Sequence, residues 1–140
     1  MDPRNLAGYS GKSLSSKLGL KGDTNLAILN APDHYDELIG GWPVGCSVSR
    51  ELNEPSFDFI HYFTNNQADL KHDIHDLAQH LDKRGMLWVS WPKLVRGAIR
   101  NMTEQIIRDI AIPLGLVDIK VCAVDETWSA LKLVWRKENR

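Results

Sequence analysis

The sequence lacks most of the features that mark specialised classes of protein. It has only two cysteines, Cys46 and Cys122, and neither belongs to a CxxC or Cys/His pattern. Each falls in an apolar, strand-like run, which favours buried thiols in a reducing cytosol, although the sequence alone leaves a disulfide open. No apolar run approaches the roughly 18 residues of a membrane-spanning helix, and none follows the first residues as in a signal peptide. We therefore expect a cytoplasmic protein with no membrane segment.

An excess of charge of one sign is also lacking. The 17 Lys and Arg residues and the 18 Asp and Glu residues nearly cancel, so no overall positive field attracts nucleic acid or an anionic membrane. We expect no nucleic-acid partner. The share of hydrophobic residues, 43%, is that of an ordinary globular protein. The prediction is a single domain over residues 1–140, either a monomer or a homodimer.

Residues 85–93 form the most distinctive apolar run, with the sequence Gly-Met-Leu-Trp-Val-Ser-Trp-Pro-Lys. Aromatic and β-branched residues between a glycine and a proline are typical of a buried central strand. Helical patterns lie on both sides of this run and further strand patterns lie beyond them. The run is therefore expected inside a mostly parallel sheet, with its carboxyl end near a ligand site.

Strand and helix patterns alternate along the rest of the chain. Helices are expected at about 10–19, at 32–39, at 67–81 and from Thr103 to Pro113. Strands are expected at 25–31, 46–50, 57–63, 116–124 and 130–136, the last two joined by a loop at 125–129. This order predicts a three-layer, Rossmann-like α/β fold, in which a mostly parallel sheet of about six strands ends in an antiparallel hairpin.

Two short motifs resemble a phosphate-binding loop and a metal site, but neither is interpreted as such a site. Gly11-Lys12-Ser13 matches the end of a phosphate-binding P-loop, but Leu6 replaces the first glycine of that motif and no strand precedes it. His72, Asp76 and His80 have the i,i+4 spacing of helical metal ligands. A solvated polar face explains them, because metal sites usually draw ligands from more than one element. We predict no metal site.

Residues 57–93 resemble the second half of the class I S-adenosylmethionine-dependent methyltransferase fold, where a Phe-Asp-apolar strand, a helix and a Gly-apolar-Trp-Val-Ser strand follow one another. From residue 8 to residue 140 the chain is similar to a family of short uncharacterised bacterial proteins, a domain of unknown function with a methyltransferase-like fold. The matching stretches are 7–12, 30–32, 87–93 and, longest, Leu-Gly-Leu-Val-Asp-Ile-Lys-Val-Cys-Ala-Val-Asp-Glu-Thr-Trp-Ser at 114–129. The resemblance implies a fold and no activity.

The turn that holds the cofactor in such enzymes differs here. Binding the methionyl group requires a Gly-rich turn after the first strand, because residues without a Cβ let the backbone approach the ligand. The turn at 30–35 reads Asn-Ala-Pro-Asp-His-Tyr, has no glycine, and loses an amide donor at Pro32. Glu51 stands where a carboxylate for the ribose hydroxyls is expected, but a single acidic residue after a strand is usually solvated. No cofactor is predicted.

In open α/β sheets, ligands bind beyond the carboxyl ends of the strands, where the strand order reverses. This rule places a candidate crevice between the first and third strands. Its predicted residues are Asn30, Pro32, Thr64, Asn65, Ser90, Trp91 and Lys93.

A second candidate is the basic loop after the central strand. Lys93, Arg96 and Arg100 add positive charge beside the start of the helix capped by Thr103, a combination that suits phosphate or carboxylate. A solvated basic loop is the alternative. The expected partner of the protein is a small anionic ligand or another protein.

The expected hairpin tip carries two adjacent carboxylates, Asp125 and Glu126, beside Trp128. Acid–base chemistry can be imagined there, but a turn needs polar residues in any case. We expect Trp128 to close the core or the crevice, because an exposed tryptophan leaves a large apolar area in water. Trp88 and Trp91 are expected on opposite faces of their strand, in the core or at a dimer surface.

Two classes of function follow. The first is a non-catalytic, methyltransferase-like module that binds a ligand or a partner without the cofactor. The second is a small enzyme that uses S-adenosylmethionine or another nucleotide in an altered pocket. The glycine-free turn favours the first class, and no catalytic residue can be assigned.

Overall fold

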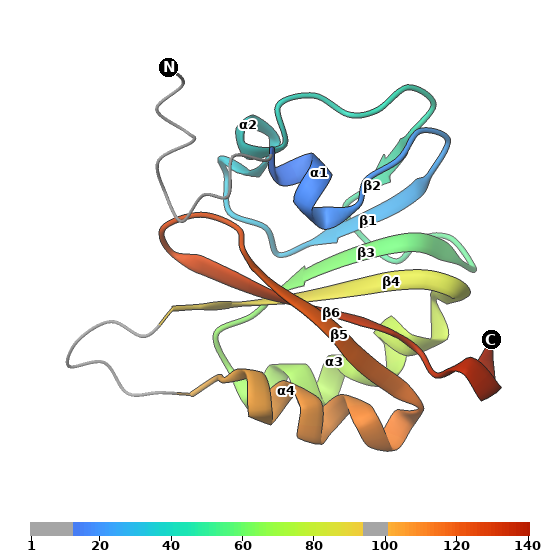
Figure 1. The fold of residues 1–140 in the computed structure, drawn as a ribbon, viewed down its shortest axis with the longest axis vertical. Coiled ribbons are helices and arrows are strands. Elements are labelled where there is room, and N and C mark those ends of the chain that lie inside the picture. Colours follow the sequence, from blue (N-terminus) through green and yellow to red (C-terminus); the bar gives the residue numbers. More distant parts are fainter. Residues whose placement is uncertain (1–12, 94–100) are drawn as a thin grey trace.

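The computed structural model describes residues 13–93 and 101–140 (Figure 1). Its centre is a six-stranded sheet with the order β2-β1-β3-β4-β6-β5. The strands are β1 (Asn25–Leu29), β2 (Ser47–Ser49), β3 (Phe57–Phe63), β4 (Leu81–Pro92), β5 (Leu116–Ala123) and β6 (Trp128–Trp135). The first four strands pair in parallel, whereas β6 runs antiparallel to both β4 and β5.

Helices cover both faces of the sheet. α1 (Leu14–Leu18) and α2 (Tyr35–Ile39) lie on one face, and α3 (Gln67–Gln79) and α4 (Glu104–Ala111) lie on the other (Figure 1). Short 3-10 turns follow α4 at η2 (Ile112–Leu114) and β6 at η3 (Lys137–Asn139). This arrangement confirms the predicted three-layer α/β fold with a C-terminal antiparallel hairpin.

The two faces of the sheet have cores of different composition. The core under α3 and α4 is mainly aliphatic and includes Trp91, whereas the core under α1 and α2 is rich in aromatic rings and includes Trp88. The two tryptophans point in opposite directions, as predicted, because side chains alternate along a strand. The indole N–H of Trp88 donates to the carbonyl of Leu18 at 3.0 Å and so ties α1 to the sheet.

Side-chain caps define where three of the helices begin. The hydroxyl of Ser13 accepts from the backbone N–H of Ser16 at the start of α1. The Asn66 side chain accepts from two backbone amides at the start of α3, and the Thr103 hydroxyl accepts from the amide of Ile106 at the start of α4. Each cap satisfies amides that have no partner within the helix.

Several predicted boundaries were wrong, and tertiary pairing explains two of these errors. α3 ends at Gln79 and β4 begins at Leu81, because the carbonyl of His80 accepts from the amide of Phe57 and so joins the sheet. β6 begins at Trp128 rather than at residue 130, because Pro92 of β4 extends the pairing to that position. β1 ends at Leu29, and the next residue, Asn30, has a left-handed backbone with φ 59°.

The cysteines differ from the expectation of buried thiols. Cys46 lies before β2, outside any strand, while Cys122 lies in β5; both are free and half-buried. None of the helices within residues 13–93 and 101–140 is long and apolar enough to cross a membrane.

Candidate functional site

A cleft of about 390 Å³ opens at the carboxyl ends of β1 and β3. The chain leaves β1 toward β2 on one side and leaves β3 toward β4 on the other, so the strand order reverses at this point. In open α/β sheets such a reversal creates a crevice between neighbouring loops. The cleft is lined by Asn30, Tyr62, Phe63, Thr64, Asn65, Asp69, Asp73 and Trp128.

Polar groups on the α3 side of the cleft hold one another in place. The Tyr62 hydroxyl donates to a carboxylate oxygen of Asp73 at 2.5 Å. Burial, together with this hydrogen bond to a carboxylate, raises the pKa of the Tyr62 phenol, which therefore stays protonated. Asp69, one helical turn before Asp73, also lines the cleft. The other oxygen of Asp73 lies 3.1 Å from Nδ1 of His72, so Asp69 is the carboxylate of this wall that is better placed to accept from a ligand.

The opposite wall is aromatic. Trp128 is half-buried and packs edge-on against Phe63, with 5.1 Å between the ring centroids. Asn30 lies at the rim, where its side-chain amide donates to the carbonyl of Phe63 at 3.4 Å. An asparagine tolerates the left-handed conformation better than most residues, which accounts for the sharp exit of the chain from β1.

The tip of the β5–β6 hairpin is fastened to the same edge of the sheet by Asp125. One of its carboxylate oxygens accepts from the backbone amides of Thr127 and Trp128, both at 2.8 Å. The other lies 2.8 Å from Nε2 of His34, in the turn after β1. The backbone carbonyl of Asp125 accepts from Nζ of Lys93 at 2.7 Å. Two strand ends are thus tied to one hairpin residue.

The charge of Asp125 is stabilised by these contacts. Partial burial raises the pKa of the carboxyl, but the hydrogen bonds from His34 and from the amides of Trp128 and Thr127 outweigh it. The pKa is therefore below its ordinary value, and Asp125 is an anion at neutral pH. These contacts make Asp125 a structural clamp between the turn after β1 and the hairpin tip.

A buried chain of three side chains lies beneath the turn after β1. The Tyr35 hydroxyl is 2.8 Å from Nδ1 of His61, and Nε2 of His61 is 2.7 Å from Oγ of Ser90. All three residues are at most 1% exposed. Burial lowers the pKa of His61 to about 3, so its ring is neutral at physiological pH. A ligand has no access to this chain, whose role is to hold Tyr35 under the turn.

Three of the residues predicted for the crevice line the cleft, namely Asn30, Thr64 and Asn65. Ser90 does not, because alternation along β4 points its hydroxyl to His61 in the core. Trp91 points to the opposite face and packs under α3 and α4. Lys93 reaches the hairpin tip, and the carbonyl of Pro32 accepts from the amide of Tyr35 in a turn beside the cleft.

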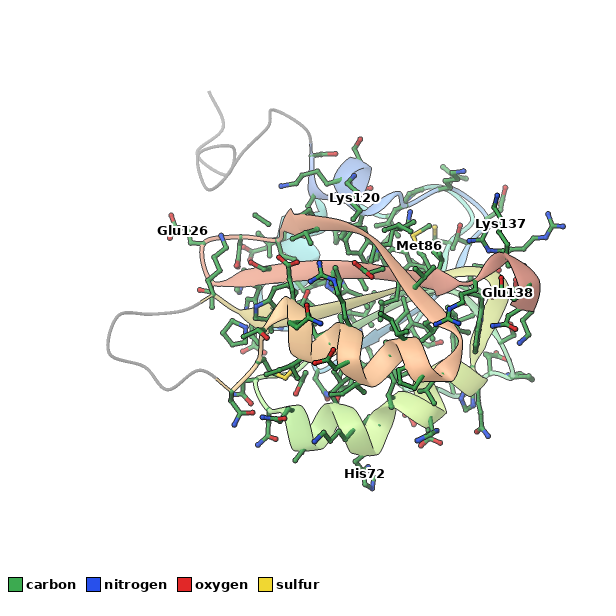
Figure 2. All side chains as sticks on the ribbon, turned by 60° about the horizontal axis from the view of Figure 1, so that its bottom comes forward. His72, Met86, Lys120, Glu126, Lys137 and Glu138 are labelled. Carbon is green, nitrogen blue, oxygen red and sulfur yellow. The ribbon has the colours of Figure 1, made fainter. Side chains whose placement is uncertain are left out.

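The structure describes only some of the residues predicted for the anion loop, the hairpin tip and the ribose carboxylate. Arg96 and Arg100 lie outside the described residues, so the anion loop stays a prediction; Thr103 caps α4. Glu126 is exposed at the hairpin tip and points away from the protein (Figure 2). Glu51 is exposed after β2.

Sequence reasoning missed the contributors from α3 and the buried histidine. Asp69 and Asp73 have the i,i+4 spacing that places both on one face of α3, and that spacing was a usable signal. His61 sits within an aromatic run that indicates only a buried strand. Among residues 13–93 and 101–140, no three His, Cys, Asp or Glu side chains are grouped as metal ligands. His72 projects from the outer face of α3 (Figure 2).

The fold is that of S-adenosylmethionine-dependent methyltransferases. The structure is similar to a SAM-dependent methyltransferase from Aquifex aeolicus, with a TM-score of 0.63 and 11% identity over 94% of this chain and 93% of that one. It is also similar to a putative type 11 methyltransferase from Sulfolobus solfataricus, with a TM-score of 0.57 and 12% identity over 81% and 85% of the two chains. At such low identity the likeness concerns the fold.

The family is shown by the sequence. The family model "Protein of unknown function (DUF3052)" matches residues 48–137, and the chain belongs to this family. No curated protein matches the chain. The match includes β3, the helices of one face and the hairpin, and it begins after the turn that follows β1.

Proposed function

We propose that this protein is a non-catalytic module with a methyltransferase-like fold, which binds a ligand or partner and does not bind S-adenosylmethionine. The observation that carries the proposal is the 2.8 Å contact between His34 and Asp125. It ties the turn after β1 to the hairpin tip, at the end of the strand where a glycine-rich cofactor turn would otherwise leave room for a ligand.

The backbone of this turn supports the proposal. Pro32 has no N–H to donate, and the amide of Tyr35 donates to the carbonyl of Pro32. The Tyr35 ring is 1% exposed and is held from below by His61. A side chain anchored in the core prevents the turn from opening toward a cofactor. The turn therefore has few hydrogen-bond donors available to a cofactor, and its conformation is fixed.

The neighbouring end of β3 supports the binding role. Its cleft combines an aromatic wall at Trp128, the amide of Asn65 and the carboxylates of Asp69 and Asp73. Ligand sites typically pair apolar surface with a few placed polar groups. The described lining holds carboxylates and no basic side chain, which suits a ligand with amine or other donor groups more than an anion.

The alternative is a small enzyme that uses S-adenosylmethionine or another nucleotide in an altered pocket. Calorimetry and thermal unfolding with S-adenosylmethionine, its demethylated product, adenosine and ATP separate the two. The proposal expects no heat of binding and no rise in melting temperature, because only a ligand that binds the native state stabilises it. Stoichiometric binding of S-adenosylmethionine at micromolar affinity overturns the proposal. An Asn65→Ala variant tests whether any binding uses the cleft.

A further inference from the structure

Basic side chains gather on the open face of the sheet beside α1, on residues that do not line the cleft. We define this basic face by six residues: Lys21, Lys83, Arg84, Lys120, Lys132 and Arg140. Lys120 of β5 and Lys132 of β6 are direct partners in the strand pairing. Nζ of Lys120 also donates to the carbonyl of Lys17 at 3.3 Å, and its side chain lies next to α1 (Figure 2).

A groove of about 480 Å³ runs into this face. It is lined by Lys83, Arg84, Gly85, Ile119, Val134 and Arg140. Val134 and Lys132 are two positions apart on β6, so their side chains share one face of the strand. The groove is therefore continuous with the Lys120–Lys132 pair, and together they combine positive charge with an exposed apolar side chain, Ile119, which is 55% exposed.

Three lysines of the basic face have no carboxylate partner among residues 13–93 and 101–140. Like charges directly opposite one another on paired strands are unfavourable. Partial burial, then Lys120 and Lys21, lowers the pKa of Lys132. Asp118 of β5 does not offset this charge, because its carboxylate accepts from Arg108 of α4 at 2.8 Å. Lys21, Lys120 and Lys132 form no ion pair with any residue of the described ranges.

Protection of the sheet edge explains only part of this pattern. β5 is an edge strand, and a lysine together with a bulge at Ile119 discourages another strand from pairing with it. Lys132, however, lies on β6, one strand inside the edge. Lys21, Lys83 and Arg140 lie outside β5 as well. These charges need a different explanation.

We propose that the basic face binds an extended acidic segment of a partner protein, in which carboxylates alternate with apolar side chains. Charge complementarity selects an anionic partner, and the exposed Ile119 with the half-buried Val134 provides apolar contact. Single-stranded nucleic acid fits less well, because it needs aromatic platforms for its bases. The Trp135 ring lies 4.2 Å from Nζ of Lys83 but is only 8% exposed. No aromatic side chain is among the exposed large hydrophobic residues described.

Fluorescence anisotropy with a labelled peptide of alternating glutamate and valine tests this proposal. The wild-type protein is expected to bind the peptide, and its affinity should fall as salt is added because surface charges are screened. The double variant Lys120→Gln/Lys132→Gln binds about tenfold more weakly. Lys71→Gln, on the outer side of α3, is the control and changes the affinity by less than about twofold. The double variant also melts no lower than the wild type, because it removes like-charge repulsion.

Four results overturn the proposal: no peptide binding, equal binding by the double variant, equal binding of a peptide with lysine in place of glutamate, or tighter binding of an oligothymidylate of the same charge. The last result assigns the face to nucleic acid. This surface is separate from the cleft, so an Asn65→Ala variant binds the acidic peptide as the wild type does. A negative result with the acidic peptide therefore does not contradict the proposed function. Binding of S-adenosylmethionine, which would overturn the proposed function, does not contradict peptide binding by the basic face.

Discussion

The carboxyl ends of β1 and β3 are neighbours, but side chains close the turn after β1 whereas a cleft opens after β3. After β1 the turn is closed by the Tyr35 ring below and by His34 and the hairpin tip above. After β3 the chain runs through Thr64 and Asn65 into the capped start of α3 and leaves a cleft. The comparison shows that a few side chains can close the end of one strand while the end of the adjacent strand stays open.

The largest effect is expected from breaking the buried support of the closed side. His61→Ala should lower the free energy of unfolding by about 3 to 5 kcal/mol, because it leaves a cavity and two buried hydroxyls, of Tyr35 and Ser90, without a partner. Denaturant unfolding measures the change. His61→Phe, which fills the volume without the hydrogen bonds, should cost less. A loss below about 1 kcal/mol for the alanine variant would show that the turn does not depend on this chain.

The same histidine makes stability depend on pH. Its folded-state pKa of about 3 lies below the ordinary 6.5, so the unfolded chain takes up the proton first as the pH falls. The contribution of His61 to the free energy of unfolding is therefore constant above about pH 6.5. Below that pH it falls by up to about 1.4 kcal/mol per pH unit. Unfolding at pH 7 and pH 5 should differ by about 2 kcal/mol from this residue. The dependence should be weaker in His61→Phe, and an equal slope in that variant would assign it to other groups.

Removing the aromatic wall should enlarge the open side at a smaller cost. Trp128→Ala should lower stability by about 1 to 2 kcal/mol, less than for a fully buried tryptophan, because the side chain is half-buried. Trp128→Phe, which keeps a ring against Phe63, is the matched control and should lose less. Chemical denaturation decides the size of both changes. A cost within about 0.5 kcal/mol for the alanine variant would indicate an exposed, unpacked ring.

The smallest effect is expected at the clamp between the two sides. Asp125→Asn should cost about 0.5 to 1 kcal/mol at pH 7, because it removes the charge that His34 and two backbone amides stabilise. The folded-state pKa of Asp125 is depressed, so its contribution is present above the ordinary carboxyl pKa and is lost as the pH falls through the depressed value.

Urea unfolding at pH 7 and at pH 3 checks both parts of this prediction. The gap between Asp125→Asn and the wild type should narrow at the lower pH. Glu126→Gln removes a neighbouring charge that points into solvent and should leave stability nearly unchanged at both values (Figure 2). Equal effects of the two substitutions would contradict a clamp at Asp125.

Most of the fold could be predicted from local pattern. The period of apolar residues in α3 and the alternation of Trp88 and Trp91 on β4 each depend on a few neighbouring residues, and both predictions agree with the structure. The cleft could be predicted in outline, because strand order alone locates a reversal between β1 and β3. Asn30, Thr64 and Asn65 follow from that rule.

Two residues expected in the crevice do not line the cleft, and they show the limit of the rule. Ser90 and Trp91 lie near the correct strand end, but alternation points one to His61 and the other under α3 and α4. Position along a strand is visible in a sequence, whereas the face that a residue presents depends on which layer covers it. Asp69 and Asp73 were missed because the sequence pattern does not show which part of the polar face of α3 borders the cleft.

The sequence by itself determined the α/β class, the order of the elements and the absence of glycine from the turn after β1, since these depend on residues close together in the chain. Only the tertiary structure decided how that turn is closed. His34 and Asp125 are 91 positions apart, and Tyr35 and Ser90 meet only through His61. Contacts of this kind depend on how the layers pack, because packing alone brings distant side chains within hydrogen-bonding distance.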